Sequence, residues 1–317
     1  EDQFDSDDQF VDTQMRKFGE RQAWQLDAEL RRDSTRSEVE ELGGIVAATR
    51  VERRSLRPTW TRVFNEKNSL LVGGNWSDAE YDSARFSDYE QYGFDATWVR
   101  QLGERLSLQT GVYNSRFQSD ASTESRGTES DTIGLRLTLV REFNEQLSGS
   151  LSLGARRVET PFLAPPSFFC LLFGIGCPVP VVLESSGFTT EAGLGYQGET
   201  WNGSLSVSRS LNPDALSGQL LESDRISAKY SRQLRPSVFF DFAVEFYSDQ
   251  SLESFSEFDR DRYFLTPAIR WQFAERWSYT TTVRHRMRET FRNARYSEGE
   301  ATAIFFKVRY SHPRARW

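Results

Sequence analysis

The chain has 317 residues, of which 38% are hydrophobic and 14% aromatic, and its formal net charge is -7. The content of 24 Phe, 11 Tyr and 8 Trp excludes simple disorder, and the acidic balance argues against a nucleic-acid partner. The longest apolar stretch, residues 168–183, is interrupted by Gly174, Gly176, Pro178 and Pro180, which excludes a helical membrane protein.

The amino-terminal segment is acidic. Residues 1–10 read EDQFDSDDQF, which is typical of a mature end left after removal of a signal peptide. We therefore predict that residues 1–20 form a periplasmic tail, that residues 21–311 form one β domain, and that residues 312–317 form a short carboxy-terminal tail.

The strongest signal in the rest of the chain is period-two alternation, which is typical of β-strands. In residues 238–246, for example, Val238, Phe240 and Phe242 alternate with Phe239 and Asp241. The pattern predicts about fourteen strands, each long enough to cross a bilayer obliquely. Pro58 and Pro267 fall inside strands and predict a bulge or a skipped hydrogen bond at each.

Two kinds of connection alternate between these strands. The short connections are residues 65–68, 103–105, 144–146, 199–202, 235–236 and 274–276. The long, polar connections are residues 34–45, 82–88, 119–130, 159–187, 212–219, 249–258 and 289–298. Short turns on one rim and long loops on the other are typical of an outer-membrane barrel. An even number of strands would place both ends of the barrel at the short-turn rim.

A soluble β-sandwich also alternates, but its turns vary in length at both ends. Here the aromatic residues cluster beside the short turns, as in a membrane girdle. These residues are Trp60, Phe64, Trp98, Phe143, Trp201, Trp271, Phe273 and Trp277. The fold class predicted is therefore an all-β, transmembrane, antiparallel up-and-down β-barrel in the bacterial outer membrane.

Two stretches carry a resemblance to a known family. Residues 53–82 (RRSLRPTWTRVFNEKNSLLVGGNWSDAEYD) and residues 210–247 (SLNPDALSGQLLESDRISAKYSRQLRPSVFFDFAVEFY) look like repeating units of an outer-membrane β-barrel family. That family is associated with the exopolysaccharide export and exosortase systems of Gram-negative bacteria. The resemblance implies a barrel and a role in polysaccharide export, and the family has no catalytic motif to carry over.

The segment 159–187 is unusually apolar for a loop. Its Cys170 and Cys177 are the only cysteines of the chain, and we predict a disulfide between them, made in an oxidising compartment. Exposed apolar segments mark interaction sites. The segment therefore folds inward as a pore constriction, lies on the outer leaflet, or docks a partner protein. The residues concerned are Phe168, Phe169, Leu171, Leu172 and Phe173.

We find no pattern that predicts catalysis. The two histidines are His285, on the outward register of its strand, and His312, in the tail, which disfavours a Ser-His-Asp hydrolase. A zinc site needs clustered His or Cys, and a phosphate loop of the GxxxxGK[ST] type is absent. We expect a protein that is not an enzyme and that has no cofactor and no metal site.

The charges predicted to face the lumen divide the chain into two parts. In the first nine strands Arg31, Arg53, Arg57, Arg136 and Arg156 balance Asp27, Glu29, Asp95, Glu142 and Glu191. In the last five strands an excess of basic residues forms one wall: Arg225, Lys229, Arg262, Arg270, Arg284, Arg286, Lys307 and Arg309. Only Asp241 and Glu245 oppose them. Either this wall favours anions, or its arginines pair with carboxylates of loops folded into the barrel.

Two functions follow from this organisation. The first is a channel or export barrel, of the porin type, for an exopolysaccharide or another anionic, extended solute. The second is a structural barrel that does not conduct and that anchors an envelope complex through its loops and its acidic tail. The expected partners are outer-membrane lipid, a polysaccharide, and periplasmic or outer-membrane export proteins.

Overall fold

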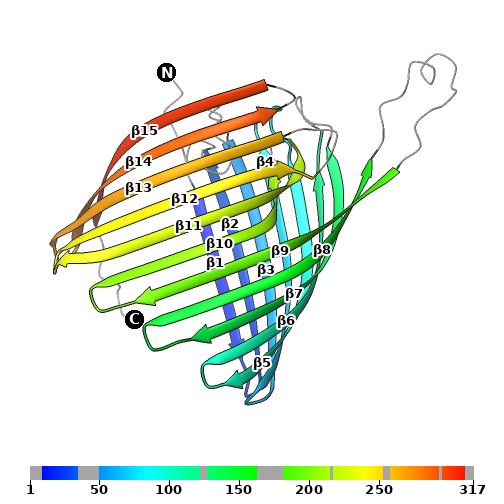
Figure 1. The fold of residues 1–317 in the computed structure, drawn as a ribbon, viewed down its shortest axis with the longest axis horizontal. Helices are drawn as coiled ribbons and strands as arrows, with labels where there is room; N and C mark the ends of the chain where they lie inside the picture. The colour runs from blue at the N-terminus through cyan, green and yellow to red at the C-terminus, as the bar shows by residue number, and fades with distance from the viewer. Residues whose placement is uncertain are drawn as a thin grey trace. The chain divides into compact units, whose positions relative to one another are not determined.

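The computed structural model describes residues 9–34, 50–121, 127–162, 181–214, 217–252, 258–292 and 295–310. These residues form a sheet of fifteen strands in which each strand pairs with its neighbours in sequence order (Figure 1). The strands are β1 (Gln9–Phe18), β2 (Gln22–Ser34), β3 (Arg50–Asn65), β4 (Asn68–Tyr81), β5 (Tyr89–Gly103), β6 (Leu106–Ser119), β7 (Thr128–Glu142), β8 (Leu147–Phe162), β9 (Val181–Gln197), β10 (Trp201–Asp214), β11 (Gln219–Arg235), β12 (Val238–Ser251), β13 (Phe258–Ala274), β14 (Trp277–Arg292) and β15 (Arg295–Tyr310). The prediction of an all-β, antiparallel, up-and-down fold is confirmed.

By contact density the chain divides into two compact units. Unit 1 comprises Glu1–Thr138, Leu153–Thr189 and Asn212–Leu221, and unit 2 comprises Leu139–Ser152, Thr190–Leu211 and Glu222–Trp317. No helix in the described part of the chain is both long and apolar enough to cross a membrane.

The sequence predicted about fourteen strands with residues 1–20 as a tail, and the described residues form fifteen strands. Gln9–Phe18 is β1, and it pairs antiparallel with β2 from Gln9↔Arg32 to Phe18↔Ala23. The odd count means that β1 and β15 run in the same direction. β1 therefore begins at the end of the unit 1 strands where the long connections lie, which contradicts the expectation that both ends of the barrel lie at the short turns.

The short connections are where the sequence predicted them, and side chains explain two of them. The Asn65 Oδ1 atom accepts hydrogen bonds from Lys67 N at 3.0 Å and from Asn68 Nδ2 at 2.9 Å. The Asn144 Oδ1 atom accepts in the same way from Gln146 N at 2.9 Å and from Leu147 N at 2.7 Å. Asparagine favours such turns because its side chain replaces a backbone acceptor. We call this end of the strands the short-connection end.

The two strand prolines interrupt the ladder without shifting it. Pro58 is opposite Leu26 of β2, but the pairing with β4 passes from Leu56↔Trp76 to Thr59↔Gly73. Pro267 is opposite Phe242, and the pairing with β14 passes from Leu265↔His285 to Ala268↔Thr282. Each proline lacks the N–H that the second neighbour would need. Of the two predicted outcomes, the structure shows the skipped pairing and no bulge at either proline.

The strands extend further into the predicted long loops than the sequence indicated. Residues 289–298 were predicted to be a loop, but β14 and β15 remain paired as far as Arg292↔Arg295.

The alternation gives the sheet two chemically different faces. We call the face that carries Ile133, Leu135, Leu153, Ile304 and Phe306 the apolar face, and these side chains are exposed. The other face, which we call the polar face, carries the charged and hydroxyl side chains. A sheet with an exposed apolar face is suited to lipid, because in water such a surface would aggregate.

Candidate functional site: a basic polar face in unit 2

All eight basic residues predicted for the wall lie on the polar face of strands β11 to β15 in unit 2. The registers establish this for β12 to β15, because residues directly opposite each other share a face. Arg262 is opposite Tyr247 and Arg270 is opposite Phe239. On the last two strands Arg284 and Arg286 are opposite Ala303 and Ala301, while Lys307 and Arg309 are opposite Thr280 and Ser278.

Glu245 of β12 pairs with both basic residues in the β11 part of this face. Its Oε1 atom lies 3.1 Å from Arg225 Nη2 and 3.4 Å from Lys229 Nζ. Its Oε2 atom accepts a hydrogen bond of 2.7 Å from the Tyr247 hydroxyl. The ring of Tyr247 in turn lies 4.9 Å from the guanidinium carbon of Arg225 and 4.9 Å from that of Arg262. These contacts hold the two arginines in defined positions.

Asp249, near the other end of β12, holds two arginines of β13. Its Oδ2 atom accepts from Arg260 Nε at 3.0 Å, from Arg260 Nη2 at 2.9 Å and from Arg262 Nη2 at 2.7 Å. Ser223 Oγ donates to its Oδ1 atom at 2.6 Å. The side chains of Arg260, Arg262 and Asp249 are 5%, 8% and 3% exposed. A carboxylate from a neighbouring strand therefore pairs with Arg262.

Strands β13 to β15 carry basic residues that are not neutralised in this way. No carboxylate of the described residues lies within 4.0 Å of a basic nitrogen of Arg270, Arg286, Lys307 or Arg309. Instead, the guanidinium of Arg270 lies 4.7 Å from the ring centroid of Phe239, and that of Arg284 lies 5.4 Å from the ring centroid of Phe305. This part of the face holds an excess of positive charge.

Sequence reasoning missed two members of this face, Arg260 and Arg288. Arg288 is opposite Arg262, and Arg260 is opposite Thr290. Both lie two residues beyond predicted members, Arg262 and Arg286, so the alternation contained the signal.

The basic residues extend along nearly the whole length of the strands. Arg309 of β15 lies opposite Ser278 of β14, and Arg288 lies ten residues further along β14. At about 3.3 Å per residue this is roughly 33 Å along the strand. The hydrocarbon core of a bilayer is about 30 Å thick. These basic residues of β11 to β15 therefore form a track that reaches from one end of the strands to the other, and we call it the basic track.

The polar face of unit 1 has a different character. Asp27 is opposite Arg57 and accepts hydrogen bonds from Gln14 and Gln25, both at 2.6 Å. At the end where the long connections lie, Val51, Ala79, Tyr81 and Phe86 form a buried cluster. The polar face of unit 1 therefore carries charges of both signs together with a buried apolar cluster.

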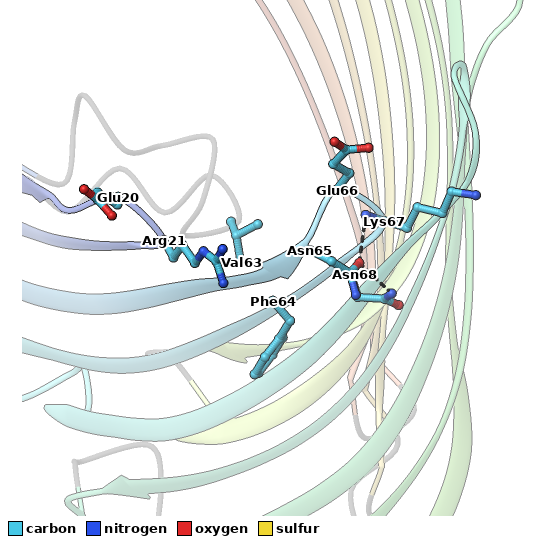
Figure 2. Close-up of a pocket in the computed structure, with 8 residues that line it drawn as sticks. All are labelled: Glu20, Arg21, Val63, Phe64, Asn65, Glu66, Lys67 and Asn68. Carbon is cyan, nitrogen blue, oxygen red and sulfur yellow. Dashed lines mark hydrogen bonds between the residues drawn. The ribbon is translucent and has the colours of Figure 1, made fainter.

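Unit 1 also contains an open cavity of about 720 Å³ at the short-connection end, lined by Glu20, Arg21 and residues 63–68 (Figure 2). Glu20 and Glu66 offset Arg21 and Lys67, so its lining is neutral overall. Phe64 lines it from the apolar face, since its ring stacks on Trp98 with a centroid distance of 5.3 Å.

Other predicted residues can be placed as follows. His285 lies on the apolar face opposite Leu265, with its Nδ1 atom 2.9 Å from Thr302 Oγ1. Among the described residues there is no group of three or more His, Cys, Asp or Glu arranged to hold a metal ion. Cys170, Cys177 and the segment Phe168, Phe169, Leu171, Leu172 and Phe173 lie outside the described residues.

The chain was compared with known proteins. No family model matches it, and no curated protein matches it. Solved structures do match. The FrpB iron transporter of Neisseria meningitidis has a TM-score of 0.57 at 9% identity, over 89% of this chain and 51% of that protein. The ferric enterobactin receptor PfeA of Pseudomonas aeruginosa has a TM-score of 0.51 at 6% identity, over 98% and 71%. BauA, the ferric preacinetobactin receptor of Acinetobacter baumannii, has a TM-score of 0.52 at 9% identity, over 96% and 65%.

These likenesses establish the fold. The chain spans about half the length of FrpB, the first of these structures. Its strands follow the arrangement of an outer-membrane β-barrel, a fold that belongs to the bacterial outer membrane.

Proposed function

We propose that the chain is an outer-membrane transport barrel whose basic track carries an anionic, extended solute across the membrane. The observation that carries this proposal is the run of basic residues along β13 to β15, because Arg270, Arg286, Lys307 and Arg309 have no carboxylate partner among the described residues. Like charges on neighbouring strands repel one another, and such an arrangement is stabilised when an anion lies between them.

The structural neighbours support transport as the class of function. The three proteins named above are an iron transporter and two receptors for ferric siderophores. None of these names describes an enzyme. For this chain we propose an acidic polysaccharide as the exported substrate. The grounds are the resemblance to the exopolysaccharide-export family and the length of the basic track. Arginine suits such a solute because its planar fork pairs with successive carboxylates.

Conductance in planar bilayers tests this proposal. In a KCl gradient the wild-type protein should show a reversal potential of the anion-selective sign. The triple variant R270Q/R284Q/R309Q should shift it toward zero, since substitutions on a lumen face mainly tune selectivity. The triple variant R54Q/R116Q/R157Q removes the same charge from the apolar face and should leave it unchanged. Cation selectivity in the wild type, or an unchanged potential in the first variant, would overturn the proposal.

A second part of the experiment uses polymers to test which substrate is carried. An oligomer of an acidic sugar, such as oligoalginate, should block the wild-type current, while dextran of the same length should not. Equal block by the two polymers would overturn an acidic polysaccharide as the substrate and leave the transport proposal standing.

The second candidate is a structural barrel that does not conduct. The buried Asp249 cluster and the buried residues Phe86, Phe117 and Leu221 favour it, because they are packed as in a filled interior. Absence of any current from correctly folded protein, for wild type and variants alike, would favour this candidate.

A further inference from the structure

Four strands carry an arginine at the same place on the apolar face, two residues before an apolar residue that lies beside a short connection. The pairs are Arg62 and Phe64 on β3, Arg100 and Leu102 on β5, Arg141 at the end of β7 with Phe143 directly after the strand, and Arg232 and Leu234 on β11. All eight side chains are exposed. On one side Arg62 is opposite Leu70 and Arg100 is opposite Leu108, both apolar, and on the other side they are opposite Gln22 and Asn68, which carry no charge. On β9 and β13, Leu194 and Trp271 take the place of the arginine.

These four arginines differ from the arginines at the opposite end of the apolar face. There, Arg54 lies 2.8 Å from Glu52 and 3.5 Å from Asp78, and Arg157 lies 2.6 Å from Glu184. Arg116 pairs with Glu129 in the same way. At the short-connection end, no carboxylate of the described residues lies within 4.0 Å of Arg62, Arg100, Arg141 or Arg232. The apolar face is therefore neutralised by internal ion pairs at one end and basic at the other.

An aromatic ring lies beside one of these arginines in each unit. In unit 1 the guanidinium of Arg62 lies 5.6 Å from the ring centroid of Phe64, which stacks on Trp98 at an interplanar angle of 27°. In unit 2 the guanidinium of Arg141 lies 5.1 Å from the ring centroid of Phe143. Aromatic side chains gather at the level of lipid headgroups, where long basic side chains also reach the interface. The arrangement thus recurs in both units.

The neighbourhood of Arg62 in unit 1 is open. Phe64, whose ring the Arg62 guanidinium approaches, also lines the open cavity of Figure 2, with Arg21 and Lys67 among the other lining residues. Because Glu20 and Glu66 offset those two cations, the excess charge of this region comes from Arg62 and Arg100. β3 and β5 are two strand spacings apart, about 9.5 Å, and Arg100 lies two residues beyond the level of Arg62, because Arg62 and Trp98 are both opposite Leu70. Two long arginine side chains that converge from these positions can reach one phosphate.

We propose that this surface binds the phosphate of an anionic phospholipid, with Arg62 and Arg100 forming one headgroup site in unit 1 and Arg141 a second position in unit 2. The acyl chains would cover the exposed apolar residues next to the arginines, such as Trp98 and Leu102. That apolar surround selects a lipid over a free phosphate ion. The proposal depends on the apolar face alone, so it stands or falls independently of the solute proposed for the basic track.

Native mass spectrometry of the full chain, released from nanodiscs of phosphatidylcholine mixed with phosphatidylglycerol, tests the proposal. The wild type should retain phosphatidylglycerol in preference to phosphatidylcholine. R62Q/R100Q should lower that preference by roughly 30-fold, the value for two arginines that each contribute about 1 kcal/mol at an anionic surface. The matched control R54Q/R116Q removes the same charge from the opposite end of the same face and should keep the preference.

Three results would overturn the proposal: no preference in the wild type, the same preference in R62Q/R100Q, or an equal loss in the control. If R62Q/R100Q does not fold, R62K/R100K retains the charges and R100Q alone removes one of them. R62K/R100K should keep most of the preference for phosphatidylglycerol. R100Q should lower that preference about 5-fold, by the same value of about 1 kcal/mol per arginine. Added inorganic phosphate should not displace the retained lipid, and displacement would indicate a free-anion site instead.

Discussion

Arg260 donates two hydrogen bonds to one carboxylate oxygen of Asp249, and both side chains are almost completely buried on the polar face of unit 2. The same oxygen accepts from Arg262, so that one negative charge holds two positive charges. A buried charge without a partner is costly, which makes Asp249 the residue on which this cluster depends.

Replacing Asp249 by alanine should destabilise the folded protein by about 3–5 kcal/mol, because two buried guanidinium groups lose their carboxylate. The measurement is the urea midpoint of unfolding in detergent or lipid vesicles. E184Q is the matched control, since the Arg157–Glu184 pair is about half exposed and is expected to contribute about 0–1 kcal/mol. Equal midpoints for D249A and E184Q would contradict the assignment.

Gly154 should not tolerate a side chain. A Cβ atom at this position would lie 2.6 Å from the carbonyl oxygen of Leu135, and this backbone atom cannot move away cheaply. We expect G154A to cost about 1–3 kcal/mol, as overpacking does. Gly103 provides the control, because nothing lies within 4 Å of the corresponding position. A G103A variant that unfolds as early as G154A would show that the close approach is not the cause.

The topology can be tested by cysteine labelling in whole cells. If the long connections face outward, an impermeant thiol reagent should label A84C, in the connection between β4 and β5, and should not label E66C, in the β3–β4 turn. Because β1 starts at the same end as the long connections, Q9C should behave like A84C. Labelling of E66C would reverse the orientation, and protection of Q9C would contradict the placement of β1.

The disulfide between Cys170 and Cys177 stays a prediction of the sequence. Intact mass measured without reductant should be two hydrogens lower than the mass after reduction. A bridge closing so short a ring is expected to constrain the segment by roughly 2–3 kcal/mol. Alkylation of both thiols in the unreduced, denatured protein would show that they are free.

Several features of this protein follow from its sequence alone. The alternation of residues such as Leu135 and Arg136 predicts strands and assigns each side chain to a face, because the side-chain period of a strand is two. Asn65 and Asn144 predict short turns for an equally local reason, since the same side-chain oxygen that defines the turn is present in the sequence. The face of Arg270, Arg284 and Arg309 could therefore be predicted without coordinates.

The tertiary structure decided what depends on pairing between strands. β1 has no clear apolar alternation, and it becomes a strand because β2 offers it a ladder from Ala23 to Arg32. Register also determined that Asp249 meets Arg260 and Arg262, whereas Arg309 lies opposite Ser278. Alternation gives the face of a residue but not its height relative to the neighbouring strand. The partner of each charge is set by this height, and a shift of one residue would move every side chain to the other face.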